Sequence, residues 1–418
     1  MQRKDRARSS KNANPRGQET DFNINGNINN NIIINHTNNR AKKQKEGPHM
    51  NFDFSEEQKL LQHTAREYLT EHSSLGLMRD VLEGDTGYSK DLWKGVAELG
   101  WLGVAIPEEY GGAGYGYLEL AMIAGEIGRA LTPIPFGSTV YLAAEAIARE
   151  GTAEQKTQYL TGIAGGDLIG TMAIGEKPGT LTEKSIGATF SNGKLSGTKL
   201  PVPDADSADF AIVLANEGDG QSLVIVDLRA AGVECSKLES IDPTRPQAKL
   251  VFDDAPATRL GAAGAGWSIT QSVFTRAAVM MAFEQLGSAD RAFDITFEFI
   301  MNRYAFGRPV GSFQALKHRM ADLYSDRELA RSNCYYAAWA LENDDKELPI
   351  AAATAKISAS DAFDNMVVEM IQMHGGVGFT WEYDCHLFYR RAKVLAHTLG
   401  TTDEWREKLI VQLIEQAA

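Results

Sequence analysis

The sequence predicts an α+β fold that is mostly helical. Apolar residues recur at helical spacing after Phe54 and again after Gly266, and short apolar runs bounded by turn signals lie between these regions. The expected architecture is an N-terminal helical domain, a small central β-barrel or sandwich, and a C-terminal four-helix bundle. The predicted segments are a disordered extension at 1–49, the helical domain at 50–168, the β domain at 169–264 and the bundle at 265–418.

The first 49 residues differ in composition from the rest of the chain. They are rich in Asn, Lys and Arg and contain almost no aromatic residues. Such a segment buries too little apolar surface to offset the entropy lost on ordering, so we expect it to be disordered. It has no apolar stretch like that of a secretory signal, and it matches an organellar transit peptide only in part. A native upstream extension and an artificially added sequence both stay open.

The N-terminal helices are predicted from start signals and periodicity. Ser55 followed by Gln58 has the pattern of a capping box, and the apolar residues after it fall on one helix face. Three further helical periods cover residues 90–99, 117–131 and 139–150. Between the first two, residues 102–114 combine a short apolar run, Pro107 and a glycine-rich stretch, which predicts a loop with a fixed path.

The centre of the chain changes to short strands and then returns to helices. Strand-like segments occur at residues 188–190, 210–215, 222–226 and 248–252. Turn sequences such as Ser191-Asn192-Gly193 separate them, which predicts a small antiparallel sandwich or barrel. Long stretches with apolar striping follow at residues 269–302, 313–342 and 348–374. These predict the helices of the bundle.

Composition excludes several classes of function. The 418 residues carry a net charge of −13, which argues against nucleic acid as a partner, because phosphate binding favours a basic face. No apolar run approaches the roughly 20 residues that span a bilayer, so no membrane partner is expected. The three cysteines, Cys235, Cys334 and Cys385, fit neither a metal spacing nor a disulfide framework. They indicate a reducing compartment, so we expect a cytoplasmic protein without a metal site.

Two motifs in the C-terminal half suggest binding of a phosphate-containing ligand. Gln372 precedes the paired glycines Gly375 and Gly376, which would let the backbone approach a bulky group such as a pyrophosphate. A helix C-cap explains the same glycines equally well. Arg303 lies in a turn between two predicted helices, where its guanidinium could bond a phosphate bidentately. An arginine that caps a helix C-terminus is the alternative.

These motifs together resemble the acyl-CoA dehydrogenase family. The resemblance covers roughly 350 residues from Met50 onward. The matching sequences are Pro107-Glu108-Glu109-Tyr110-Gly111-Gly112, Arg303-x-x-Phe306-Gly307-Arg308-Pro309 with Phe313-Gln314, and Gln372-x-x-Gly375-Gly376-x-Gly378-Phe379. The resemblance implies an oxidoreductase of lipid β-oxidation that holds FAD at a subunit interface. Such an enzyme desaturates an acyl-CoA thioester between its α and β carbons.

The resemblance also implies roles for individual residues. Arg303, Phe306 and Gln314 would reach the FAD of a neighbouring subunit. Gln372 and Gly376 would contact the adenosine and pyrophosphate part of a FAD, and Thr401 would lie beside the cofactor. In the family, the thioester oxygen is bound by a ribityl hydroxyl and by the backbone N–H of the residue that carries the catalytic base.

The base itself is the main departure from the family pattern. The glutamate of the family's Glu-Gly-Thr aligns with Leu399, and the position used by other members, before an arginine on the preceding long helix, holds Thr275. Neither side chain removes a proton at neutral pH, so the catalytic residue is unknown. The carboxylates Glu284, Asp403 and Glu404 are nearby, but we interpret each as a charge on a helix surface.

Further departures indicate a divergent branch of the family. The segments that would cradle the flavin ring read Ile174-Gly175-Glu176-Lys177-Pro178 and Lys199-Leu200-Pro201-Val202. The sequences Asp242-Pro243-Thr244-Arg245 and Trp381-Glu382-Tyr383 resemble members that act on bulky acyl-CoAs, some of them as complexes of two related subunits. The basic stretch Arg390-Arg391-Ala392-Lys393 fits either CoA phosphates or a solvated helix face.

We therefore expect an FAD-dependent acyl-CoA dehydrogenase that acts as a homo- or hetero-oligomer. The favoured version is a subunit that binds flavin jointly with a related partner, which carries the base. An electron-transferring flavoprotein is the expected acceptor. The alternative is a non-catalytic structural subunit that stabilises a homologous catalytic partner, and a third version is an enzyme with an unrecognised base.

Overall fold

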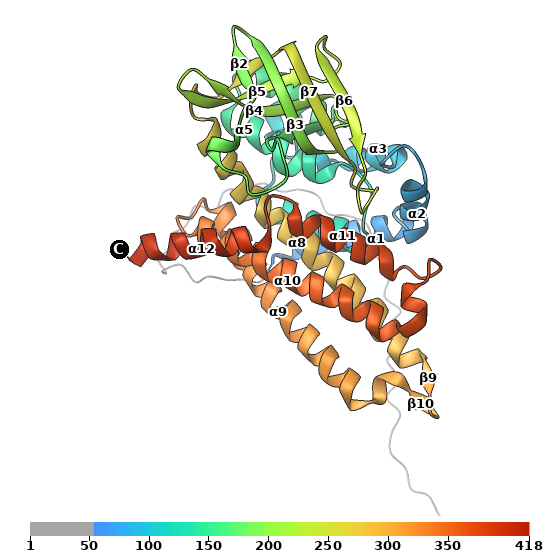
Figure 1. The fold of residues 1–418 in the computed structure, drawn as a ribbon. Coiled ribbons are helices and arrows are strands. Elements are labelled where there is room, and N and C mark those ends of the chain that lie inside the picture. Colours follow the sequence, from blue (N-terminus) through green and yellow to red (C-terminus); the bar gives the residue numbers. More distant parts are fainter. Residues whose placement is uncertain (1–53, 418) are drawn as a thin grey trace, which may run out of the picture. The chain divides into compact units, whose positions relative to one another are not determined.

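A computed structural model describes residues 54–417 of the chain (Figure 1). The predicted disordered segment at 1–49 lies outside these residues. The first described helix, α1 (Glu56–His72), begins with the capping box expected from the sequence. The Ser55 side chain accepts from the Gln58 N–H, and the Gln58 side chain accepts from the Ser55 N–H. The start signal in the sequence is therefore confirmed.

Further helical elements complete the N-terminal segment. They are α2 (Leu75–Glu83), α3 (Lys90–Glu98), α4 (Tyr117–Arg129), a π-helical segment (Gly137–Ala144), α5 (Glu145–Glu150), α6 (Ala153–Gln155), a second π-helical segment (Lys156–Leu160) and α7 (Thr161–Ala164). The loop after α3 has the fixed path that was predicted. A Cβ at Gly112 would lie 2.0 Å from the carbonyl oxygen of Ile106, so only glycine fits there.

The central strands form one sheet with the order β6-β7-β3-β2-β4-β5-β8, and β1 pairs with β4. The strands are β1 (Gly170–Ala173), β2 (Thr189–Ser191), β3 (Lys194–Pro203), β4 (Phe210–Glu217), β5 (Gly220–Asp227), β6 (Val233–Leu238), β7 (Gln247–Pro256) and β8 (Thr258–Leu260). Most pairs are antiparallel, as predicted. The β1–β4 and β2–β4 pairs are parallel, which the sequence did not indicate.

The central strand β4 is buried on both faces of the sheet, and its side chains point alternately to two different cores. Ile212 and Leu214 join the large core that the sheet shares with the helices. Ala211 and Val213 join a second core, to which β3 and β7 also contribute side chains. Because side chains alternate along a strand, the sheet has to curl around this second core. This matches the small barrel or sandwich that was predicted.

Five helices follow the sheet. They are α8 (Gly266–Asn302), α9 (Gln314–Glu342), α10 (Leu348–His374), α11 (Cys385–His397) and α12 (Thr402–Ala417), with the short hairpin β9 (Tyr304–Ala305) and β10 (Arg308–Pro309) between α8 and α9. Figure 1 shows these helices on one side of the sheet. Two glycines allow α4 to cross α8 closely. A Cβ at Gly128 would lie 1.9 Å from the Glu284 carbonyl oxygen, and one at Gly287 would lie 1.8 Å from that of Gly125.

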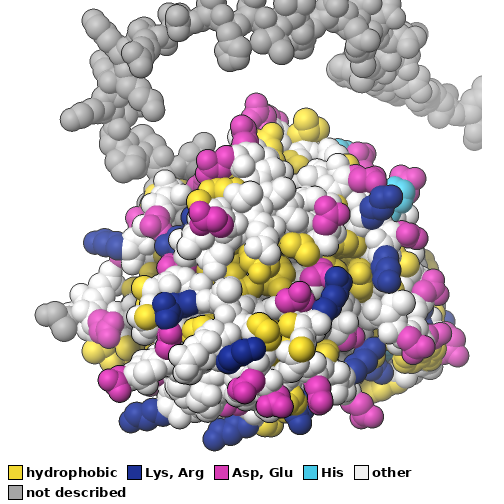
Figure 2. Space-filling model, turned by 90° about the horizontal axis from the view of Figure 1, so that it is seen from above, with side chains coloured by type: hydrophobic (Ala, Val, Ile, Leu, Met, Phe, Trp, Pro, Cys, Tyr) yellow, Lys and Arg dark blue, Asp and Glu magenta, His cyan; other side chains and the backbone are white. Residues whose placement is uncertain are grey.

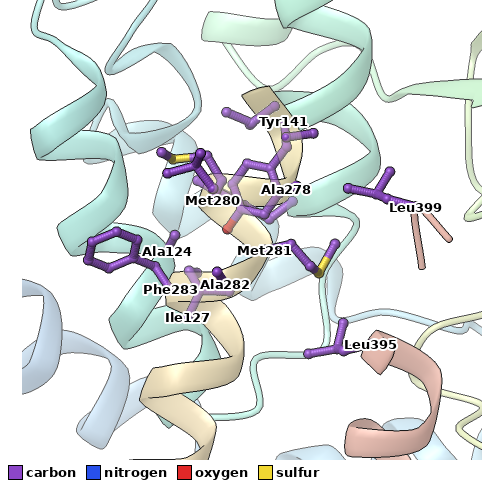
Figure 3. Close-up of a cluster of buried hydrophobic side chains, with 14 of the residues drawn as sticks. Ala124, Ile127, Tyr141, Ala278, Met280, Met281, Ala282, Phe283, Leu395 and Leu399 are labelled. Atoms are coloured by element: carbon purple, nitrogen blue, oxygen red, sulfur yellow. The ribbon is translucent and has the colours of Figure 1, made fainter. Parts of the chain in front are cut away.

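The buried side chains at this crossing come from distant parts of the chain. Figure 3 shows Ala124 and Ile127 from α4, residues 280–283 from α8 and Leu395 from α11 in one cluster. Leu399, in the segment between α11 and α12, belongs to the same buried cluster. The core therefore extends to the position that the family alignment assigns to the base.

Candidate functional site

A cavity of about 720 Å³ lies where loops of the sheet meet the segment between α11 and α12. This volume is within the range of small-molecule and cofactor sites. Its wall includes Leu142, Met172, Ile174, Phe274, Leu399 and Thr401. The polar groups around this largely apolar surface include Glu176, Lys393 and Glu404. The cavity therefore brings together the segment at Leu142, the loops of the sheet, α8 and the segment between α11 and α12, which are far apart in the sequence.

Leu399 has an unusual backbone at this cavity. It adopts the left-handed conformation, with φ of 68°, which a leucine rarely takes. The flanking amides are both bonded, Thr398 N to Val394 O at 3.1 Å and Gly400 N to His397 O at 3.3 Å. Among residues 54–417, the Leu399 N–H has no hydrogen-bond acceptor. The aligned base position thus presents an apolar side chain and an unused backbone donor.

Thr401 and Glu404 fix the start of α12 beside the cavity. Glu404 Oε2 accepts from the Thr401 N–H at 2.7 Å, and the Thr401 hydroxyl accepts from the Glu404 N–H at 3.2 Å. This reciprocal pair is a capping box. Glu404 is half-buried and lines the cavity, and its carboxylate is engaged by the cap of α12.

The second aligned base position lies next to a cavity residue. Phe274 on α8 lines the cavity, and Thr275 follows it as a half-buried residue. The Thr275 hydroxyl donates to the Gln271 carbonyl oxygen at 2.9 Å. This hydroxyl is therefore occupied by its own helix, as is common for threonine in helix interiors.

A buried lysine anchors the loop after β1, and the sequence did not reveal it. The ammonium of Lys199 on β3 is fully buried and donates to Ile174 O at 2.9 Å and to Glu176 Oε1 at 2.8 Å. Glu176 also accepts from the Gly187 and Ala188 amides. Burial acts to raise the pKa of Glu176, but the Lys199 and amide hydrogen bonds outweigh it and lower the pKa. Glu176 is thereby held as a carboxylate at the cavity wall.

The residues aligned with contacts to a neighbouring subunit's FAD lie elsewhere. Arg303, Phe306 and Gln314 are exposed at the turn between α8 and α9, and Phe306 is 95% exposed. Phe306 also has φ of 54°, so the backbone presents this large apolar ring to solvent. Arg303 lines a second cavity of about 570 Å³. These residues are thus available to another molecule and are absent from the wall of the first cavity.

The second cavity has an aromatic wall at the end of α10. The His374 ring stacks on Phe299 with a centroid distance of 4.1 Å, and its Nδ1 lies 2.7 Å from Met370 O. Burial lowers the pKa of His374, although the Met370 carbonyl acts in the opposite direction. Tyr383 lines the same cavity. His374 is therefore a neutral structural residue near neutral pH.

Gln372 and Gly376 are exposed at the end of α10. Gly375 has φ of 63° and ends the helix, so the C-cap interpretation of the glycine pair is correct for this residue. A Cβ at Gly376 would meet no atom within 4 Å, so packing within the chain does not explain this glycine. Room for a bulky group at this position fits a bound dinucleotide.

A buried network of charges corrects the expectations for Glu284 and for Arg391. Glu284 is fully buried and accepts from Arg245, so it is not a charge on a helix surface. Arg391 is fully buried, and its Nε donates to Asp242 Oδ2 at 2.7 Å. Arg391 therefore meets neither solvent nor CoA phosphates. Arg390, at the next position, is only half-buried.

Metal-binding groups and membrane-spanning helices were sought in the described residues. Within residues 54–417, no group of three or more His, Cys, Asp or Glu side chains could hold a metal ion. No helix in this part of the chain is long and apolar enough to cross a bilayer. The face seen in Figure 2 mixes basic and acidic side chains, without a continuous basic surface.

Comparison with known proteins identifies the family. The family model for the N-terminal domain of acyl-CoA dehydrogenases matches residues 55–167, and the model for the C-terminal domain matches residues 264–413. The chain is 32% identical to the acyl-CoA dehydrogenase IpdE2 of Mycobacterium tuberculosis over 355 residues, which cover 85% of this chain and 96% of that protein. The chain belongs to the acyl-CoA dehydrogenase family.

Two solved structures show the same fold. One is a variant of the Tcur3481-Tcur3483 steroid ACAD, with a TM-score of 0.79, 33% identity and coverage of 87% of this chain and 99% of that one. The other is the ChsE4-ChsE5 complex from Mycobacterium tuberculosis, with a TM-score of 0.81, 26% identity and coverage of 88% and 99%. Members of this family are FAD flavoproteins, oxidoreductases that act on acyl-CoA in fatty-acid β-oxidation.

Proposed function

We propose that this chain takes part in the FAD-dependent α,β-dehydrogenation of an acyl-CoA thioester, as one subunit of a complex with a related chain. The observation that carries the proposal is the cavity of about 720 Å³ with Leu399 in its wall. Its size suits a cofactor and a substrate portion, and the family membership of the chain supplies the reaction class. When bound, FAD supplies the hydride acceptor for this chemistry.

The chain's own residues would bind and orient the reactants. The unpaired Leu399 N–H is a donor for the thioester oxygen, which gains negative charge as the α proton leaves. Thr401 and the loop held by the Lys199–Glu176 pair would line the flavin side of the cavity. Arg303, Phe306 and Gln314, which are exposed, would reach a flavin shared with the partner. Gln372 and Gly376 would contact its dinucleotide part.

The proposal places the base on a related partner chain. Leu399 and Thr275 cannot remove a proton at neutral pH, and Glu404 is engaged by the cap of α12. Two structural relatives have names that each give two chains, Tcur3481-Tcur3483 and ChsE4-ChsE5, which supports a mixed complex. An electron-transferring flavoprotein is proposed as the acceptor, on the family resemblance alone.

Purification of the chain with and without a co-expressed homologous chain tests the proposal. We expect a visible flavin spectrum from the co-purified complex, and bleaching of this spectrum by acyl-CoA. A bound flavin without a partner chain, reduced by acyl-CoA, would instead show a self-sufficient enzyme with an unrecognised base. Absence of flavin from both preparations would contradict the proposal and leave the structural subunit, which the two unreactive base positions also favour.

A further inference from the structure

The hydrogen bonds of α11 stop one residue short of Leu399. The Thr398 N–H donates to Val394 O at 3.1 Å, the usual helical bond between residues four apart. The next bond of this series would run from the Leu399 N–H to the Leu395 carbonyl oxygen. Instead, Thr398 has an extended backbone with ψ of 131°, and the Leu399 N–H stays without an acceptor among residues 54–417. The two groups that would pair in a longer helix are therefore kept apart.

The Leu395 carbonyl oxygen is bonded to a lysine from another helix. Lys356, on α10, is only 1% exposed, and its Nζ donates to Leu395 O at 2.7 Å. Carbonyl oxygens in the last turn of a helix lack helical partners, and the helix dipole favours a cation beside them. Lys356 thus supplies the donor that the Leu399 N–H would provide if α11 continued.

Two buried side chains hold the Lys356 ammonium in this place. Gln285 Oε1, on α8, accepts from Lys356 Nζ at 3.3 Å, and so does the hydroxyl of Ser360, one turn further along α10, at the same distance. Gln285 Nε2 in turn donates to the Ser360 hydroxyl at 2.9 Å. Together with Leu395 O, these groups give one acceptor to each of the three ammonium N–H groups. The lysine is therefore fixed on the Leu395 carbonyl.

The burial of Lys356 carries an energetic cost. Its three acceptors are all uncharged, whereas a lysine is rarely buried without a charged partner. Burial lowers the pKa of Lys356 to about 7, although Glu284 acts in the opposite direction. An apolar side chain would pack α10 against α11 without this cost. Packing alone therefore does not account for a lysine at this position.

We propose that Lys356 is a positioning residue, which holds the Leu395 carbonyl oxygen and so leaves the Leu399 N–H free to bind the thioester oxygen. This inference rests on the proposed function, which assigns that N–H to the thioester oxygen. Without the lysine, Leu395 O would be a buried acceptor without a partner, and pairing with the Leu399 N–H would satisfy both groups. Such pairing would also release the left-handed backbone of Leu399 and remove the donor from the cavity.

Binding of two matched ligands tests the proposal without a need for turnover. The probes are an acyl-CoA and an S-alkyl-CoA thioether of the same chain length, in which a methylene replaces the carbonyl group. Their affinities are measured by calorimetry on the assembly in which the chain purifies with flavin. The ratio of the two affinities reports on the donors that meet the carbonyl oxygen.

Lys356→Met removes the donor to Leu395 O and keeps a side chain of similar length. We expect the preference for the thioester over the thioether to fall by about 5-fold, the effect of losing one hydrogen bond. A lysine with a purely structural role would affect the two probes alike, because they differ only at the carbonyl. Its loss would then leave the ratio of the affinities unchanged.

Gln285→Leu is the matched control. It removes another acceptor of Lys356 at a fully buried position, but it leaves the bond between Lys356 and Leu395 O. We expect the wild-type ratio of affinities, even if the melting temperature falls. If Lys356→Met alone does not fold, the double variant Lys356→Met with Gln285→Leu replaces both ends of a buried polar contact by apolar groups. Comparison of this double variant with Gln285→Leu then gives the same ratio test.

The possible results separate this inference from the proposed function. An unchanged ratio in Lys356→Met would overturn the inference and leave the proposed function in place. An equal fall in Gln285→Leu would also overturn it, because that variant retains the bond to Leu395 O. Equal affinity of the wild type for both probes would show that the Leu399 N–H does not meet the thioester oxygen. If the wild-type assembly binds neither probe, the proposed function fails, and the inference fails with it.

Discussion

Arg391 and Asp242 form a fully buried ion pair across 149 residues of sequence, with 2.7 Å between Nε and Oδ2. Nη2 of Arg391 also donates to the Thr244 hydroxyl at 2.8 Å. The pair joins α11 to the loop between β6 and β7. This interaction therefore ties the bundle to the sheet at a point beside the candidate site.

Arg391→Ala should destabilise the protein by about 3–5 kcal/mol, because it leaves Asp242 buried without its counter-charge. The matched control is Arg390→Ala, which removes a half-buried side chain bonded to Ile241 O and should cost about 1 kcal/mol or less. Chemical denaturation measures both. An Arg391→Ala variant of normal stability that binds CoA thioesters weakly would restore the CoA-phosphate interpretation.

Helix periodicity and cap signals predicted most of the helices, because these signals come from residues within a few positions of one another in the sequence. Ser55 and Gln58 are three residues apart, and the long helix after Gly266 carries apolar residues at a regular spacing. Strand β3 was missed, because Gly197 and Pro201 interrupt a segment with few apolar residues. β3 pairs with β2 across the local turn at Asn192-Gly193 and, on its other edge, with β7, which is far away in the sequence.

Sequence analysis predicted residues of the candidate site only at positions that the family resemblance identified. Leu399 and Thr401 lie at the cavity, as their alignment with the family pattern suggests. Lys199, Glu284 and Arg391 are charged residues that sequence reasoning assigns to the surface by default. Their burial depends on partners from other elements, Glu176, Arg245 and Asp242, and no local pattern marks such pairs.

Gly376 and Gly378 should respond differently to substitution. A Cβ at Gly378 would lie 2.5 Å from the Ile371 carbonyl oxygen, so Gly378→Ala should lower the melting temperature. Gly376→Leu meets no atom of the chain near its Cβ, so it should retain the melting temperature and lose bound flavin. Thermal unfolding and the flavin content per chain measure the two effects. Full flavin content in Gly376→Leu would exclude a dinucleotide at this position.

Phe306→Ala should weaken assembly without a loss of stability within the chain. The Phe306 ring is 95% exposed. It meets the Phe313 ring edge-on, with 6.4 Å between the two ring centroids. The matched control is Leu60→Ala, which removes another exposed apolar side chain, on α1. Sedimentation and flavin content compare the two variants. Equal behaviour of both would argue against a role of Phe306 at a shared flavin.

Stability should depend on pH through Asp204. Burial raises its pKa to about 6, although Arg245 and Ser138 act to lower it. The folded protein therefore holds this proton more tightly than the unfolded chain, whose aspartates titrate near pH 4. The associated stability is present at about pH 4 and is lost as the pH rises through about 6, a change of about 2–3 kcal/mol.

Asp204→Asn removes this titration and should flatten the stability profile between about pH 4 and 6. Melting temperatures of the wild type and the variant across this window give the difference. Asp403→Asn, at an exposed position on α12, is the control and should leave the profile of the wild type unchanged. A wild-type profile that rises from pH 4 to 6 relative to Asp204→Asn would contradict the assignment.

Leu399→Glu tests whether the cavity is an acyl-CoA dehydrogenation site without its base. The residue already has the left-handed backbone, which a glutamate adopts at about the same cost as a leucine. Leu399→Gln is the matched control, because it has the same length and hydrogen-bonding oxygen but accepts no proton at neutral pH.

The decisive measurement is the rate of flavin reduction by acyl-CoA in the flavin-loaded complex, with the partner chain's own base removed by substitution. The account predicts that Leu399→Glu is about 10²- to 10⁴-fold faster than the wild type, the usual contribution of a general base, and that Leu399→Gln is not. Equal rates for all three proteins would contradict the placement of Leu399 at the reacting carbon.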